Sequence, residues 1–232
     1  MAADVLVPFR RVLWGLVALS WLVAVALGVH FAGTAQPGPL DSAVTSWVHA
    51  TVGDRDGAAP ALIATSSPPV VYAVVAATAL VGLARRKWEF AALAIAGPAL
   101  VVALVEFVGK PLVERRLTHY LCYPSGHTAS AVSALAVALL GLAAGAGLGR
   151  RLLTLAAWLV GTCAIGLGLV ATDYHYPTDV VGGVAVVLGT VLPLAALADA
   201  AAARRRSPAL AARQQRGDLP TSGTNPPTKG PA

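Results

Sequence analysis

Two short polar segments interrupt an otherwise apolar chain, and each contains a histidine in a setting that suits chemistry. The first reads Pro-Ser-Gly-His at 124–127, and the second reads His-Tyr-Pro-Thr-Asp at 175–179. A carboxylate at Asp179, four residues after His175, can hold one imidazole nitrogen and leave the other free to attack an electrophile. His127 can then supply a proton to the leaving oxygen.

The residues around these histidines predict an anion-binding site. Pro124 and Pro177 suit the beginning of a helix, so two helices are expected to start here with free N–H groups and positive dipole ends. Gly126 lets a ligand approach the backbone, and Ser125 adds a hydroxyl. The neighbouring loop adds three cations: Lys110, Arg115 and Arg116. The anion that such an arrangement suits best is phosphate, so we expect a phosphotransfer site that needs no metal and no other cofactor.

The remainder of the chain is typical of an integral membrane protein. Of its 232 residues, 56% are hydrophobic and 12% are charged, and the mean hydropathy is +0.70. A membrane-spanning helix needs about 20 mostly apolar residues, and we expect six, at 12–33, 62–84, 89–109, 127–148, 152–172 and 179–201. The predicted fold is therefore all-α: a six-helix transmembrane domain over residues 1–203 and a disordered, Pro- and Gly-rich tail over 204–232.

The distribution of lysine and arginine predicts the orientation of these helices. Most of the 17 basic residues fall on one side of a six-helix chain, near both termini and in the loops at 85–87 and 150–151. The positive-inside rule makes that side cytoplasmic, with both termini there and both histidine segments outside. The net charge of +6 follows from this topology and requires no nucleic-acid partner. The long external segment at 34–61 is expected to contain an interfacial helix, with Trp47 at the level of the headgroups.

Each polar feature has a simpler interpretation when it is taken alone. A His-x3-Asp spacing is common by chance, Pro-Ser-Gly-His could be a turn followed by a helix cap, and the basic loop could merely bind lipid headgroups. Glu106, one turn before Lys110, is predicted to be the ion-pair partner of that lysine. The functional interpretation rests on the occurrence of all these features in one order and on one side of a membrane.

On these motifs the chain resembles the membrane-bound branch of the type-2 phosphatidic acid phosphatase family, which shares its site with vanadium haloperoxidases. That family carries Lys-x6-Arg-Pro, then Pro-Ser-Gly-His, then Ser-Arg-x5-His-x3-Asp. The second motif is complete at 124–127, and the end of the third matches at 175–179. The resemblance implies that His175 is a nucleophile that forms a phosphohistidine, that Asp179 orients it and that His127 is the general acid. It also implies a set of phosphate-binding groups: Lys110, Ser125 and the amide of Gly126.

The chain departs from the family pattern at two places. Leu117 and Thr118 stand where the first motif has Arg-Pro, although Arg115 and Arg116 directly precede them. Gly168-Leu169 replaces the Ser-Arg of the third motif. By the resemblance, one phosphate-binding arginine is missing and another is shifted.

The sequence thus predicts a membrane lipid phosphatase with its site at the outer leaflet. Its substrate would be a lipid phosphomonoester or diphosphate, such as a polyprenyl diphosphate, phosphatidic acid or phosphatidylglycerol phosphate. Two alternatives stay open at this point: a lipid phosphotransferase, and a non-catalytic membrane protein that binds lipid phosphates. The sequence leaves the choice of lipid and the oligomeric state undetermined.

Overall fold

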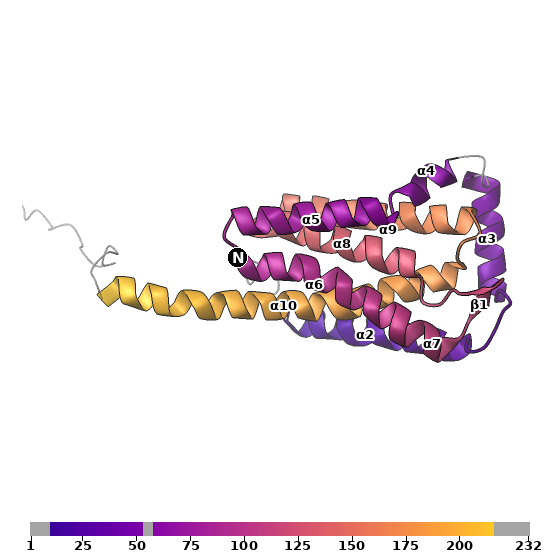
Figure 1. The fold of residues 1–232 in the computed structure, drawn as a ribbon, viewed down its shortest axis with the longest axis horizontal. Coiled ribbons are helices and arrows are strands. Elements are labelled where there is room, and N and C mark those ends of the chain that lie inside the picture. Colours follow the sequence, from indigo (N-terminus) through magenta and orange to yellow (C-terminus); the bar gives the residue numbers. More distant parts are fainter. Residues whose placement is uncertain (1–9, 53–57, 216–232) are drawn as a thin grey trace, which may run out of the picture.

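The computed structural model describes residues 10–52 and 58–215 and is mostly helical (81%), as the sequence predicts. Its long helices run side by side as a bundle (Figure 1). They are α2 (Arg10–His30), α5 (Pro68–Ala84), α6 (Trp88–Leu104), α8 (Gly126–Ala143), α9 (Leu148–Ala171) and α10 (Pro177–Gln215). Helix α10 packs against α2, α6 and α8, and the buried core consists largely of Ala, Val and Leu side chains between these helices.

The short elements gather at one end of the bundle, where α3 lies across the ends of the long helices (Figure 1). They are α3 (Pro39–Val52), α4 (Ala59–Ala64), the π-helical turn η2 (Val105–Gly109), α7 (Lys110–Val113) and the antiparallel strands β1 (Arg116–Leu117) and β2 (Tyr120–Leu121). Helix α3 confirms that the predicted interfacial segment is helical, and Trp47 is exposed on its surface.

Five helical segments are long and apolar enough to cross a membrane among the residues that the structure describes: Arg11–His30, Trp88–Val113, Gly126–Ala143, Leu148–Ala171 and Pro177–Arg205. The chain is therefore a multi-pass membrane protein by length and composition. The segment expected at 62–84 is divided, because α4 ends at Ala64 and α5 begins at Pro68. Two consecutive prolines disfavour helix in the residues before them. Helix α5 has 17 residues, so a sixth span stays a prediction.

Helix α10 continues to Gln215 and so passes the boundary expected at residue 203. The expectation of disorder is wrong for residues 204–215, which are helical; residues 216–232 lie outside the described part of the chain. Alanine, arginine and glutamine favour helix in this segment, and the helix continues in spite of Pro208.

The first turns of α8 and α10 are held against each other. The backbone N–H of Ser125 donates to the carbonyl of Asp179 at 3.0 Å. At Gly183 a Cβ atom would lie 2.9 Å from the carbonyl oxygen of Ser125, so only glycine permits this separation of the two helices. The helix beginnings that carry the two polar motifs therefore meet at one place.

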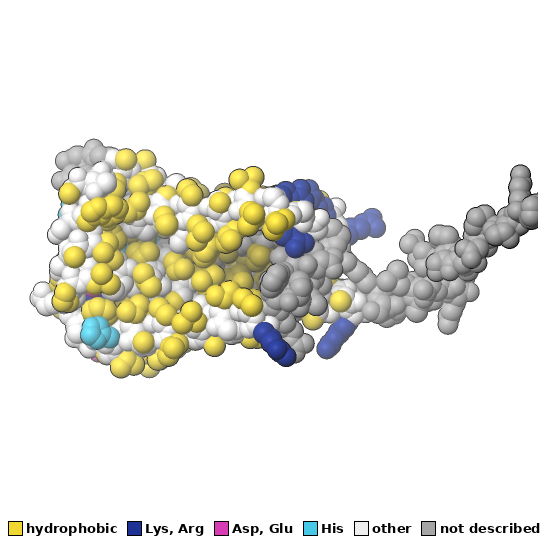
Figure 2. Space-filling view, turned by 180° about the vertical axis from the view of Figure 1, so that it is seen from behind, with side chains coloured by type: hydrophobic (Ala, Val, Ile, Leu, Met, Phe, Trp, Pro, Cys, Tyr) yellow, Lys and Arg dark blue, Asp and Glu magenta, His cyan; other side chains and the backbone are white. Residues whose placement is uncertain are grey.

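The two ends of the bundle differ in charge. Lysine and arginine side chains gather at the end opposite α3 (Figure 2). They come from the junction of α5 and α6, the beginning of α9 and the C-terminal half of α10, and include Arg85, Arg86, Lys87, Arg150, Arg151 and Arg205. The histidine motifs lie at the other end, next to α3.

Candidate active site

The two histidines of the polar motifs lie next to each other. His127 is half-buried in the first turn of α8, and His175 is buried in the turn that leads into α10. Their ring centroids are 5.9 Å apart, and the ring planes meet at 66°. Helices α8 and α10 both begin here, and in α10 the N–H of Thr178 donates to Asp41 and that of Asp179 to the carbonyl of Tyr176.

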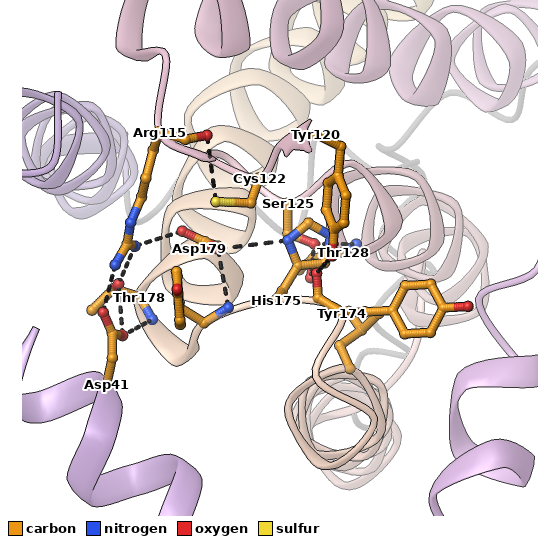
Figure 3. A network of polar contacts seen from close by, with 12 residues as sticks. Asp41, Arg115, Tyr120, Cys122, Ser125, Thr128, Tyr174, His175, Thr178 and Asp179 are labelled. Carbon is orange, nitrogen blue, oxygen red and sulfur yellow. Dashed lines mark hydrogen bonds and ion pairs between the residues drawn. The ribbon is translucent and has the colours of Figure 1, made fainter. Parts of the chain in front are cut away.

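Asp179 lies behind His175, as the His-x3-Asp spacing predicts. One carboxylate oxygen, Oδ2, is 3.6 Å from Nδ1 of His175 and accepts a hydrogen bond from the N–H of Tyr176 at 3.0 Å. The separation from Nδ1 is within ion-pair range but longer than a hydrogen bond. The other oxygen, Oδ1, accepts a hydrogen bond of 2.6 Å from Arg115. Figure 3 shows the carboxylate between the arginine and the imidazole.

The lysine expected to bind phosphate has an acidic partner. Nζ of Lys110 lies 2.7 and 2.8 Å from the two carboxylate oxygens of Glu106, which confirms the predicted ion pair. Both groups lie over Gly126, because a Cβ atom there would collide with Glu106 and would lie 3.5 Å from Nζ of Lys110. The pair spans η2 and the beginning of α7, and π-helical turns often occur at functional sites.

Ser125 forms the N-terminal cap of α8. It is fully buried, and its hydroxyl oxygen accepts from the N–H of Thr128 at 3.2 Å and from the Thr128 hydroxyl at 2.9 Å. This is the usual capping role of serine. Because the oxygen accepts in both bonds, neither bond uses the Ser125 proton.

The two adjacent arginines have different surroundings. Arg116 is exposed in β1, and its backbone N–H donates to the carbonyl of Thr34. Arg115 is completely buried, and its guanidinium lies 3.7 Å from the ring centroid of Phe31 and 4.5 Å from that of Tyr176. The structure therefore places only one of the two predicted phosphate-binding arginines at the surface.

Asp41 is a further buried residue of this cluster, one that the sequence motifs do not include. It comes from the first turn of α3, and its Oδ2 accepts from Nη2 of Arg115 at 2.6 Å. Its Oδ1 accepts from the backbone N–H and the hydroxyl of Thr178 at 2.9 and 2.8 Å. Burial alone would raise the pKa of Asp41, but the hydrogen bonds from Arg115, Thr178 and Gly38 hold that pKa below its ordinary value. Asp41 is therefore ionised at neutral pH.

The loops around His175 are connected by side-chain contacts. The hydroxyl of Tyr120 donates to the carbonyl of Tyr174 at 2.6 Å, and burial raises the pKa of Tyr120 to about 12, so the hydroxyl remains a donor. His49 of α3 lies 3.3 Å from the carboxylate of Asp173. A cavity of about 250 Å³ opens beside His175, with a lining that includes Ser42, Thr45, Ser46 and Tyr176.

The positions that depart from the third family motif have structural roles here. Leu169 is fully buried in the core, and its carbonyl accepts from the N–H of Tyr174 at 2.9 Å. A Cβ atom at Gly168 would lie 2.8 Å from the side chain of Leu62, so glycine permits the close packing of α4 on α9. Within residues 10–52 and 58–215, no three His, Cys, Asp or Glu side chains gather closely enough to hold a metal ion.

Comparison with known protein families gives a match over part of the chain. The family model of the PAP2 superfamily matches residues 108–204, which contain both histidines, Asp179 and Lys110. No curated protein and no solved structure matches the chain. The match over residues 108–204 confirms the resemblance to type-2 phosphatidic acid phosphatases.

Proposed function

We propose that the protein is a lipid phosphatase that hydrolyses a phosphomonoester or diphosphate of a membrane lipid through a phosphohistidine. The observation that carries this proposal is the pair of imidazoles, His127 and His175, 5.9 Å apart between their ring centroids. Asp179 lies behind only one of them. The family match supports a phosphatase-type activity in general.

The unequal surroundings of the two imidazoles support different roles for them. Nδ1 of His175 faces Asp179, so Nε2 is the nitrogen that attacks phosphorus. As the N–P bond forms, the bond between phosphorus and the lipid oxygen breaks, and His127 donates a proton to that oxygen. A dephosphorylated lipid leaves, and a phosphoryl group remains on His175.

Water completes the cycle. His127, now neutral, accepts a proton from a water molecule that attacks the phosphohistidine, and inorganic phosphate leaves. Lys110, Ser125 and the amide of Gly126 bind the phosphoryl oxygens, with the N-terminus of α8 behind them. Arg116 is exposed in β1 and adds a positive charge to which an approaching lipid phosphate is attracted.

Release of phosphate tests this function. Purified protein in detergent is incubated with a panel of lipid phosphates that includes phosphatidic acid, phosphatidylglycerol phosphate and a polyprenyl diphosphate, and inorganic phosphate is measured. We expect release from at least one lipid. Transfer to an added alcohol without free phosphate would instead identify a phosphotransferase. Lipid binding without any turnover would identify a non-catalytic binding protein.

Activity is expected to survive removal of divalent metal ions. The groups that we assign to the phosphate are an ammonium, a hydroxyl and helix N–H groups, which already supply positive charge and hydrogen bonds. Phosphate release is compared before and after treatment with EDTA, with a known Mg²⁺-dependent phosphatase as the control. Complete loss of activity that Mg²⁺ restores would contradict the mechanism.

We propose that the histidine end faces outward and the basic end faces the cytoplasm, because the basic residues divide in this way. The test uses H119C at one end and R150C at the other, both at exposed positions. The background is Cys163→Ala, because Cys163 is exposed whereas Cys122 is buried. A membrane-impermeant maleimide on intact cells is expected to label H119C and to label R150C only after permeabilisation. The reverse pattern would invert the topology.

A further inference from the structure

We infer that Arg115 is a positioning residue, anchored by Asp41 of α3, that holds Asp179 toward His175 and does not bind the substrate phosphate. The inference rests on the proposed function for the role of His175. It assigns a role to Asp41, which lies outside the segment that matches the PAP2 superfamily. It also gives Arg115 a different role from the phosphate-binding one that its sequence position predicts.

The guanidinium of Arg115 bridges two carboxylates from distant parts of the chain. Nη1 donates to Oδ1 of Asp179 at 2.6 Å and to the hydroxyl of Thr178 at 2.7 Å, and Nη2 donates to Oδ2 of Asp41 at 2.6 Å. All three charged side chains are completely buried. The planar fork of arginine suits such a bridge, whereas lysine offers only a point charge.

The bridge fixes the side of Asp179 that faces away from the imidazole. Oδ1 is held by Arg115, and Oδ2, on the same rigid carboxylate, lies 3.6 Å from Nδ1 of His175. Movement of the guanidinium would therefore rotate or shift the oxygen that orients the nucleophile. Figure 3 shows this order from Asp41 through Arg115 and Asp179 to His175.

The surroundings of Arg115 leave no approach for a phosphate. Its side chain has no exposed surface, and its guanidinium carbon lies within 3.7 Å of the centroid of Phe31 and 4.5 Å of that of Tyr176. An anion at Nη1 or Nη2 would have to displace a buried carboxylate, and Nε, which has no hydrogen-bond partner, is itself buried. Lys110, which is partly exposed, is the cation that lies over Gly126 and the beginning of α8.

Asp41 serves as the fixed end of the bridge. Besides Arg115, its carboxylate accepts from the backbone N–H and hydroxyl of Thr178 and from the N–H of Gly38. The position of α3 is thereby tied to the first turn of α10, which carries Asp179. If the contacts of Asp41 were purely structural, they would contribute to folding alone. The experiment must therefore measure catalysis and stability separately.

The main variant is the double substitution Arg115→Met with Asp41→Asn. It removes one positive and one negative charge, so the net charge of the buried cluster is unchanged while Asp179 loses its contact with Arg115. Arg115→Lys is the second variant. Each is compared with the unmutated protein and with Arg150→Met, an exposed arginine at the opposite end of the bundle. The measurements are kcat and KM on the lipid phosphate that the protein hydrolyses best, inhibition by inorganic phosphate and thermal unfolding.

For the double variant we expect kcat to fall by roughly 10²-fold, the loss that a small misplacement of a reacting group can cause, while inhibition by inorganic phosphate is unchanged. In Arg115→Lys the decrease in kcat should be smaller, again with unchanged inhibition by phosphate. If the double variant does not fold, this single variant decides whether Arg115 positions Asp179 or binds the phosphate. Arg150→Met should behave as the unmutated protein. An unchanged kcat, or weaker phosphate inhibition in step with lower kcat/KM, would overturn the inference.

A readout that does not depend on turnover keeps this inference separate from the proposed function. Diethyl pyrocarbonate modifies exposed and nucleophilic histidines, and mass spectrometry gives the rate at each site. In the double variant, modification of His175 should slow relative to that of the exposed His119, because Nδ1 loses its fixed carboxylate. If the unmutated protein releases no phosphate, the proposed function fails, and this ratio still decides whether Arg115 positions Asp179 toward His175. An unchanged ratio would reject the positioning role.

Discussion

Replacement of His175 by alanine is expected to reduce phosphate release from a lipid phosphate to the background rate. The substitution removes the nitrogen that attacks phosphorus, and no covalent intermediate can then form. Because His175 is buried and the rings of Tyr120 and His127 lie next to it, truncation also leaves a space that water can enter. The measurement is inorganic phosphate released by the purified variant, compared with the unmutated protein at equal concentration.

Two controls make this result specific. His119→Ala removes an exposed histidine of the neighbouring loop and should retain full activity. Acid quenching of the unmutated protein during turnover should leave no stable phosphoprotein, whereas alkaline quenching should preserve a phosphoryl group on His175, since phosphohistidine is labile to acid. Substantial activity in the His175 variant would exclude this histidine as the nucleophile.

The effect of His127→Ala is expected to depend on the leaving group. A lipid alkoxide is a poor leaving group and needs the proton that His127 donates, and general acid catalysis is typically worth about 10²–10⁴-fold. Nitrophenolate is far more stable as an anion and leaves with little assistance. The variant should therefore lose roughly that factor on a lipid phosphate and clearly less on nitrophenyl phosphate.

Comparison of the two histidine variants on both substrates tests the division of roles. His175→Ala should be inactive on the lipid and on the aryl ester, because both reactions require the nucleophile. Equal losses on the two substrates for His127→Ala would mean that this residue positions the phosphate instead of donating a proton. Binding of inorganic phosphate, measured as competitive inhibition, should change little in His127→Ala.

The parts of the site that are local in sequence could be predicted from the sequence. The His-x3-Asp spacing places Asp179 one helical turn after His175, and the ion pair between Glu106 and Lys110 follows the same rule. The apolar stretch at 127–148 and Pro124 predict where α8 begins. These features depend on neighbouring residues, so no tertiary information is needed to find them.

The partner of Arg115 could not be found in this way, because Asp41 is 74 positions away. One signal was available, since arginines in an external loop oppose the positive-inside bias, and a buried one needs a carboxylate. The length of the second helix was also mispredicted, because average hydropathy conceals the break that Pro68 and Pro69 impose. The hydrophilic character of residues 204–215 likewise concealed their helix propensity.

The contact between Lys110 and Glu106 has a consequence for how a substrate binds. The ammonium already has an anionic neighbour 2.7 Å away, so a phosphate that binds Lys110 competes with that carboxylate for the charge of the ammonium. The net attraction is therefore smaller than that of an unpaired lysine. Affinity should accordingly vary less with ionic strength than at an unpaired lysine, because salt weakens the existing and the incoming ion pair alike.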